Sequence, residues 1–236
     1  TGYTEWGASG LAAVWAEENT RESIYNAFRR KETFATTGSR IKVRFFGGYE
    51  IDDVFNKEDP INYAYLNGVT MGSDLFQSEN KIPQFMVWAL RDLNRAPLDR
   101  VQIIKGWTEL SGKPHEKIYD VACADGRRPD SKTKLCKDSR AKVNLNNCRI
   151  SKNLGADELK AVWQDPDFDP NLKAFYYVRV LENPTCRWSS WDAIKSGEIP
   201  RADLPATIQE RAWSSPIWYI PDNEGITIGN ILPDDI

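Results

Sequence analysis

Alternating apolar and polar positions predict β-strands over most of the chain. Residues 41–45 (IKVRF) alternate with a period of two, which is the spacing of a strand with one buried face. Residues 82–90 (IPQFMVWAL) are apolar on both faces, as in a central strand. Further strands are expected at residues 99–107, 117–122, 158–163, 173–182 and 207–219. Pro216 should place part of the last of these at a sheet edge or a bulge.

About seven strands separated by turn signals are typical of a β-sandwich, so we expect a mainly β fold. Trp88 and Trp163 lie inside apolar strands, and both are expected in the core. Short helices are expected near residues 60–66 and 190–196. Ser189 with Asp192 resembles a capping box at the start of the second of these helices.

The first 38 residues have a different pattern, that of one βα unit. Residues 11–15 (LAAVW) form a short apolar run, and Asn19 with Glu22 predicts the N-cap of a following helix. One βα unit cannot cover its own apolar face. We therefore expect residues 1–38 to pack on the β-sandwich of residues 39–236 or on a second copy of the chain, as a homo-oligomer.

Composition and charge exclude several classes of function. The 236 residues are 41% hydrophobic and 28% charged, which is the balance of a globular protein. A net charge of −3 argues against a nucleic-acid partner. No apolar run approaches the length of a membrane span.

The chain contains one histidine, His115, so a multi-histidine zinc site cannot be built from this chain alone. Its position in a turn favours a surface residue. A small complete enzyme would have to use His115 as general base with a nearby carboxylate or thiol, and the sequence indicates no partner for it.

Four cysteines, Cys123, Cys136, Cys148 and Cys186, lie in one third of the chain. An even number without any CxxC pair favours disulfides and an oxidising compartment over a zinc site. The alternative is four free thiols in a cytosolic protein.

Three aspartates alternate in the segment DPDFDP, at Asp165, Asp167 and Asp169. This spacing resembles the start of a calcium-binding loop. However, Pro170 stands where that loop requires glycine and Tyr176 where it requires glutamate. We therefore expect an Asp/Pro turn before a strand, and no metal site in this chain.

Nine tryptophans and nine tyrosines are many for a chain of this length. Such residues fill the core of a sandwich, but exposed ones could also stack on sugars. This observation gives the alternative hypothesis of a module that binds a glycan or another ligand of the cell envelope.

Four polar residues, Glu17, Glu18, Asn19 and Arg21, lie where the first predicted strand passes into the helix. In a (β/α) barrel this turn belongs to the active-site face. They are candidates for the border of an active site, and the alternative is helix capping with a solvated first turn.

Several long stretches resemble a family of large bacterial proteins known as a domain of unknown function. They are residues 10–48, 86–107, 115–123, 163–188 and 206–219, which together cover nearly the whole chain. The front half of those proteins resembles the PHP barrel (polymerase and histidinol phosphatase), a metal-dependent phosphoesterase fold.

The resemblance implies that this chain is the C-terminal part of such a protein. The His-x-His and Asp-x-His motifs that hold the PHP metals are absent here and lie upstream in the family. Residues 1–38 would then be the closing βα unit of the barrel, and residues 39–236 the accessory β-sandwich behind it. The chain alone would be catalytically inert, with no catalytic residue, and its partner would be the barrel with its divalent metal and a phosphoester or other small-molecule substrate.

The resemblance also favours an exported protein, periplasmic or secreted, which agrees with the expected disulfides. Four cysteines allow three pairings. We favour Cys123–Cys136, which closes the charged segment 124–147, and Cys148–Cys186, which joins the end of that segment to a sandwich loop.

Overall fold

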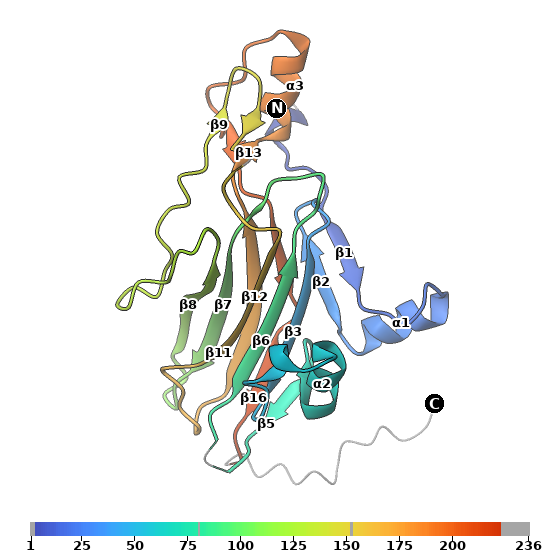
Figure 1. Cartoon of the computed structure of the whole chain (residues 1–236), viewed down its shortest axis with the longest axis vertical. Helices are drawn as coiled ribbons and strands as arrows, with labels where there is room; N and C mark the ends of the chain where they lie inside the picture. The colour runs from blue at the N-terminus through green and yellow to red at the C-terminus, as the bar shows by residue number, and fades with distance from the viewer. Residues whose placement is uncertain (1–2, 80, 152, 223–236) are drawn as a thin grey trace.

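The computed structural model describes residues 3–79, 81–151 and 153–222, and it confirms a mainly β, sandwich-like fold (Figure 1). The smaller sheet has four antiparallel strands. Their order is β11 (Glu158–Gln164), β6 (Gln84–Leu90), β3 (Lys42–Gly48) and β4 (Gly68–Thr70). The expected central strand at residues 82–90 is β6, which lies between β3 and β11.

The larger sheet is built around β12 and contains eight strands. From one edge to the other, the order is β1 (Leu11–Val14), β2 (Thr33–Thr36), β15 (Arg211–Ser214), β12 (Ala174–Glu182), β7 (Leu98–Thr108) and β8 (Pro114–Cys123). Beside the other end of β12 lie β16 (Ile217–Ile220) and, parallel to it, β5 (Asp74–Phe76).

Side chains from the two sheets meet in one hydrophobic core. The ring of Phe85 on β6 lies 4.3 Å from that of Tyr176 on β12, measured between centroids. Val43 and Phe45 from β3 and Val178 from β12 are fully buried in the same core.

Trp163 packs against Phe85 and Tyr176 in this core. Trp88 packs against Phe55 on the opposite face of the smaller sheet. Both tryptophans are only partly buried, so the expectation for them was wrong in degree.

The predicted last strand, residues 207–219, is three strands in the structure. β14 (Thr207–Ile208) pairs with β13 (Thr185–Cys186), whereas β15 and β16 both pair with β12. The break between β15 and β16 falls at Ser215 and Pro216, because proline has no N–H to donate to a ladder.

The helices lie outside the sandwich. α1 (Arg21–Arg29) follows β1, α2 (Pro60–Asn67) packs near β3 and β4, and α3 (Trp188–Ser196) lies at one end of the molecule. The remaining short elements are η1 (Tyr3–Glu5), η2 (Val54–Asn56), β9 (Val143–Asn144) and β10 (Arg149–Ile150).

Two capping assignments from the sequence are wrong. The N-cap of α1 is Thr20 rather than Asn19, because the Thr20 hydroxyl accepts from the Ser23 N–H at 3.2 Å. α3 begins after Arg187 without a side-chain cap, and the Ser189 hydroxyl instead accepts from the Arg187 guanidinium.

We call β1, α1 and the turn between them the arm, and α3 with the β9–β10 and β13–β14 pairs the tip. In Figure 1 the tip is at the top and α1 projects to the right. The arm is held to the sandwich through β2, which pairs with β15 in antiparallel register. Residues 1–38 therefore pack on the sandwich in their described part, as expected. The division at residues 38 and 39 stays a prediction, and residues 223–236 of the second predicted domain lie outside the described residues.

Both disulfides have the favoured pairing. Cys123 is bonded to Cys136, and Cys148 to Cys186. The first bond fastens the long charged loop to the end of β8, and the second joins the β9–β10 hairpin to the tip strand β13.

Candidate functional site

A pocket of about 530 Å³ lies where the arm meets the sandwich. Trp15, Ala16 and Glu17, which directly follow β1, form one wall. The opposite wall comes from β3, α2 and β4 and consists of Arg44, Asn62, Tyr65 and Thr70. We call this the arm pocket.

Glu32 forms the polar centre of the arm pocket, and only 2% of this residue is exposed. Its carboxylate accepts hydrogen bonds from Arg30 at 3.3 Å, Arg44 at 3.5 Å, and the Thr70 hydroxyl at 3.3 Å. The Tyr65 hydroxyl donates to it as well. A carboxylate with this many donors is held in one orientation.

The side chains of Tyr65 and Arg44 are both held in place by hydrogen bonds to Glu32. Burial and the bond to Glu32 raise the pKa of Tyr65 to about 12, so this hydroxyl stays protonated at neutral pH. The Arg44 guanidinium lies 3.5 Å from the ring centroid of Trp15, and it also donates to the Tyr65 hydroxyl at 2.7 Å. Arg30 also lines the pocket; it is about half exposed, and its guanidinium donates to the Trp15 carbonyl at 3.5 Å.

The four residues proposed from the sequence divide at this pocket. Glu17 lines it, and its carboxylate is exposed at the rim. Glu18 takes part in the helix start instead, because its carboxylate accepts from the Thr20 hydroxyl at 3.1 Å and its N–H donates to Ser23. Asn19 and Arg21 are exposed on the same turn and do not line the arm pocket.

Sequence reasoning missed Glu32, Arg44 and Tyr65. Arg44 is one of the polar positions that alternate with apolar ones in residues 41–45, so the pattern predicted only that it points away from the core. Glu32 directly follows the basic residues at the end of the predicted helix. Glu32 and Thr70 are 38 residues apart in the sequence, and nothing in the local pattern shows that their side chains meet in the fold. A possible signal was one acidic residue next to three basic ones at residues 29–31.

Two aspartates of the DPDFDP segment, Asp165 and Asp167, form ion pairs with lysines. Nζ of Lys105 lies 2.5 Å from the buried carboxylate of Asp165, which also accepts from the Tyr176 hydroxyl at 2.8 Å. Lys117 lies 2.5 Å from Asp167, and this contact holds the pKa of the Asp167 carboxyl below its usual range. The ammonium groups thus pair with two of the three aspartates, whereas Asp169 accepts from Asn171 in a turn.

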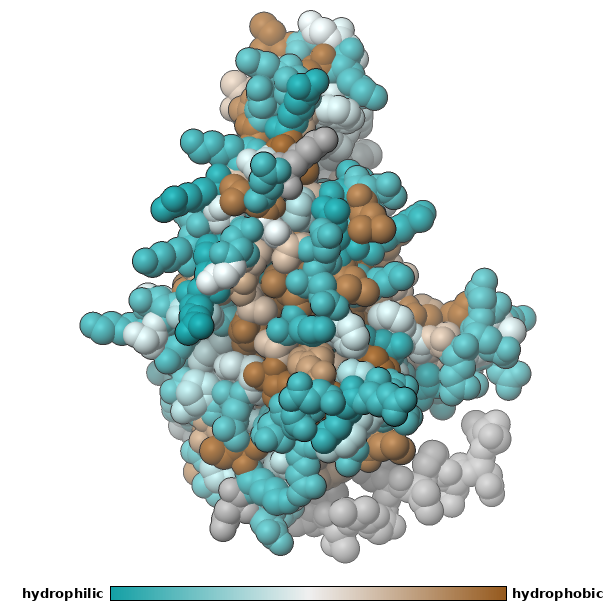
Figure 2. All heavy atoms as spheres, in the orientation of Figure 1, coloured by the Kyte–Doolittle hydropathy of each residue, from teal (hydrophilic) through white to brown (hydrophobic). Residues whose placement is uncertain are grey.

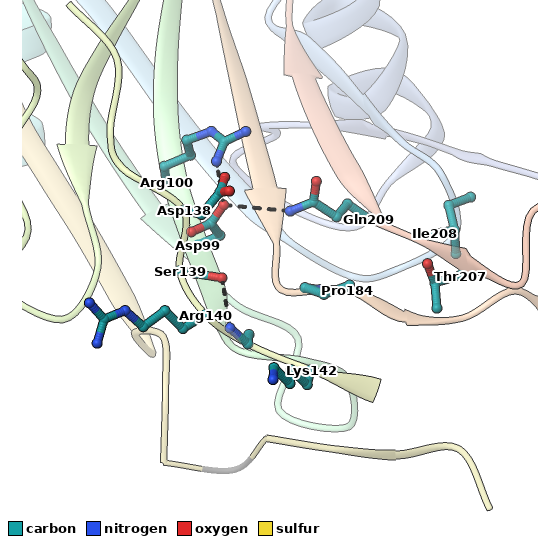
Figure 3. Close-up of a pocket in the computed structure, with 11 residues that line it drawn as sticks. Asp99, Arg100, Asp138, Ser139, Arg140, Lys142, Pro184, Thr207, Ile208 and Gln209 are labelled. Carbon is teal, nitrogen blue, oxygen red and sulfur yellow. Dashed lines mark hydrogen bonds and ion pairs between the residues drawn. The ribbon is translucent and has the colours of Figure 1, made fainter. Parts of the chain in front are cut away.

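A second pocket, of about 430 Å³, lies under the charged loop beside Asp99 (Figure 3). The Asp99 carboxylate is 1% exposed and accepts from Arg100 and Arg127, both at 2.7 Å. Gln209 also reaches it at 3.5 Å, and Figure 3 shows Arg140 pointing away from this group. The Arg127 guanidinium also donates to the Lys137 carbonyl, so this group joins the charged loop to Asp99 on β7.

His115 lies in β8 opposite Trp107 on β7, rather than in the turn that the sequence predicted, and it is partly buried because it pairs across the hairpin. Its ring stacks on Trp107 with centroids 5.1 Å apart, and Nε2 lies 2.6 Å from the Glu109 carboxylate. The Ser111 hydroxyl donates to the same carboxylate at 3.2 Å. These contacts hold the histidine flat against its own hairpin.

Residues 3–79, 81–151 and 153–222 contain no group of three or more histidine, cysteine, aspartate or glutamate side chains placed to hold a metal ion. In the same ranges no helix is long and apolar enough to cross a membrane.

Comparison with known proteins gives one match. A family model described as "Protein of unknown function (DUF3604)" matches residues 1–221. No curated protein and no solved structure matches the chain.

Proposed function

The chain belongs to the DUF3604 family, and on that premise we propose that it is the C-terminal accessory β-sandwich of a PHP-like, metal-dependent hydrolase. In this proposal an upstream barrel docks on the arm and carries the divalent metal and the reaction, which is hydrolysis of a phosphoester or a related ester. The sandwich is inert alone and helps to shape the entrance for a small-molecule substrate. The two disulfides are consistent with a periplasmic or secreted protein.

The observation that carries this proposal is the uncovered surface of the arm. Of the residues in α1 only Ala27 is buried, whereas Tyr25 is 58% and Phe28 50% exposed. Figure 2 shows the arm projecting from the body of the molecule with apolar side chains among its polar ones. An amphipathic helix in a monomeric protein normally buries its apolar face, so this face requires a covering element.

The backbone of β1 gives a second reason. Within the described residues β1 pairs only with β2, so its other edge carries unpaired N–H and C=O groups. Leu11 on this strand is also 43% exposed. A βα unit with an open strand edge and an uncovered helix needs another structural element to pack against it. In this proposal an adjoining barrel is that element.

The arm pocket supports a role at the entrance. Its rim is the Glu17 turn, which follows β1, and in a (β/α) barrel the turns that follow the strands form the active-site face. A barrel docked on the arm would bring its active-site face next to Arg30 and Arg44. These guanidinium groups could then contact a negatively charged substrate as it enters.

The test is a double substitution on α1, Tyr25→Ser with Phe28→Ser, in a family protein that contains both the barrel and this chain. Without the apolar contact the barrel and the sandwich should unfold in two separate calorimetric transitions, and limited proteolysis should separate them. Leu110→Ser is the matched control, because Leu110 is 88% exposed on the β7–β8 hairpin, away from the arm. If the double variant unfolds in the same single transition as the parent protein, the arm is not the docking surface.

A further inference from the structure

A third pocket, the largest of these at about 590 Å³, lies between the tip and the upper end of the sandwich. We call it the tip pocket. Its size is within the range of small-molecule sites. Trp188 and Trp191 from α3 and the Cys148–Cys186 disulfide line it on the tip side. Polar residues of the sandwich loops line the other side: Thr37, Asn94, Arg95 and Glu210.

The two tryptophans form a rigid aromatic wall. Trp188 is fixed because its indole N–H donates to the Trp6 carbonyl at 3.0 Å and its ring stacks on Tyr3 at 5.9 Å. Trp191 is 43% exposed, and the Lys195 ammonium lies over its ring at 5.3 Å. Lys195 lies over one face of this indole, and the opposite face offers a flat apolar surface to a ligand ring.

The polar side of the tip pocket contains a hydrogen-bond acceptor that has no donor. Oε2 of Glu210 is buried and makes no hydrogen bond to any described residue. Glu182 does not line the pocket; it is fully buried close to Glu210, and its carboxyl group interacts with the Ser39 hydroxyl. A buried acceptor without a donor is costly, so a ligand that donates to Glu210 would gain free energy here.

The charges around the pocket favour a neutral ligand over an ion. Burial, together with the nearby Glu210 carboxylate, raises the pKa of Glu182 to about 8, so Glu182 is largely protonated at neutral pH. Arg95 lines the same pocket as Glu210, and the two side chains carry charges of opposite sign. An anion would meet the Glu210 carboxylate, whereas a cation would meet Arg95.

A ligand with one apolar ring face, several hydroxyl donors and no charge is a sugar. We propose that the tip pocket binds a neutral saccharide unit, with the ring stacked on Trp191 and a hydroxyl pair donating to Glu210. Asn94 and Thr37 are placed to bind further hydroxyls from the rim. The site shares no residue with the arm, so it is independent of the hydrolase proposal.

The test is a calorimetric titration of the purified chain, followed by tryptophan fluorescence. The probes are glucose, galactose, mannose and N-acetylglucosamine, with glucuronate and choline as charged competitors. We expect saturable binding of at least one neutral sugar and a shift in tryptophan emission, with the charged probes at least about tenfold weaker.

Substitutions assign the binding to the pocket. Trp191→Ala and Glu210→Gln should each weaken binding by about tenfold or more, which is about 1.4 kcal/mol. Trp191→Phe keeps an aromatic face and should retain part of the affinity, which controls for misfolding. Trp218→Ala is the matched control, since Trp218 is 44% exposed on β16, outside the pocket, and should stay within about twofold of the unsubstituted chain.

Three results would overturn the proposal. The first is that none of the four neutral sugars gives saturable heat. The second is that glucuronate or choline binds more tightly than they do. The third is that a neutral sugar binds equally well to Trp191→Ala, which would place its site elsewhere.

Discussion

The indole N–H of Trp15 donates to the carbonyl oxygen of Val43 at 2.7 Å. This bond joins the end of β1 to β3 of the smaller sheet, whereas β2 joins the arm to the larger sheet. The arm is thus attached to both layers of the sandwich at its base, while the outer face of α1 stays uncovered. The arm is therefore anchored to the sandwich while α1 remains free to contact another domain, as expected of a docking element.

The bond from Trp15 should be measurable in the stability of the chain. Trp15→Phe keeps an aromatic ring under Arg44 but removes the N–H, leaving the Val43 carbonyl without this donor. We expect a loss of about 1–2 kcal/mol in the free energy of unfolding, measured by urea denaturation. Trp218→Phe serves as control, and an equal loss in both variants would show that the N–H bond contributes nothing specific.

Glu32 should be the most sensitive residue of the arm pocket. Glu32→Ala leaves Arg44, which is 22% exposed, without its buried partner, so we expect a loss of about 3 kcal/mol. Glu32→Gln keeps an acceptor for Tyr65 and Thr70 and should lose less. Glu17→Gln, at the exposed rim, should leave the urea midpoint unchanged. Equal midpoints for Glu32→Ala and the unsubstituted chain would contradict this description of the pocket.

The pair of Lys105 and Asp165 gives a prediction about the DPDFDP segment. Lys105→Met leaves the Asp165 carboxylate buried without its counter-charge, which should cost about 3–5 kcal/mol. Lys105→Met with Asp165→Asn removes both charges and should recover much of that loss in thermal unfolding. Calcium at millimolar concentration should not raise the melting temperature of the unsubstituted chain. A rise with calcium would show that the aspartates bind the metal after all.

Stability should fall with rising pH because of Glu182. Its pKa is raised from the usual value for glutamate to about 8 in the folded state, so the folded chain binds more protons than the unfolded chain between those values. The stabilisation from the protonated form is therefore present at low pH and is lost as the pH rises toward 8, at a slope of at most about 1.4 kcal/mol per pH unit.

Urea denaturation between pH 5 and about pH 9 measures this slope. Glu182→Gln mimics the protonated carboxyl and should flatten the profile relative to the unsubstituted chain, with the largest difference above pH 8. Parallel profiles for the two proteins would mean that Glu182 titrates with an ordinary pKa.

The fold was largely predictable from local patterns. The period of two at residues 41–45 and the continuous apolar run at 82–90 identified β3 and β6, because burial on one face or on both leaves a direct mark in the sequence. The prediction of a single strand over residues 207–219 was wrong. The apolar pattern continues through Pro216, but the hydrogen-bonded ladder with β12 is interrupted there. Local pattern also could not separate Thr20 from Asn19 as N-cap, because both side chains can accept the same bond.

The candidate sites were much less predictable. The Glu17 turn was expected at a site border and lines the arm pocket, but the buried centre of that pocket, Glu32, was not foreseen. Its partners Arg44, Tyr65 and Thr70 come from three separate elements, and their convergence depends on the packing of α2 and β4 on β3. The same holds for Glu182 and Glu210, whose proximity follows from the pairing of β12 with β15.

Hydrogen exchange on α1 tests the central proposal most directly. Amide exchange of residues 21–29 is measured in this chain alone and in a family protein that also contains the upstream barrel, with β12 as internal reference. If the barrel covers the arm, α1 should exchange at least about tenfold more slowly in the longer protein, while β12 should exchange at the same rate in both. Equal exchange of α1 in the two proteins would contradict docking through the arm and, with it, the proposed accessory role.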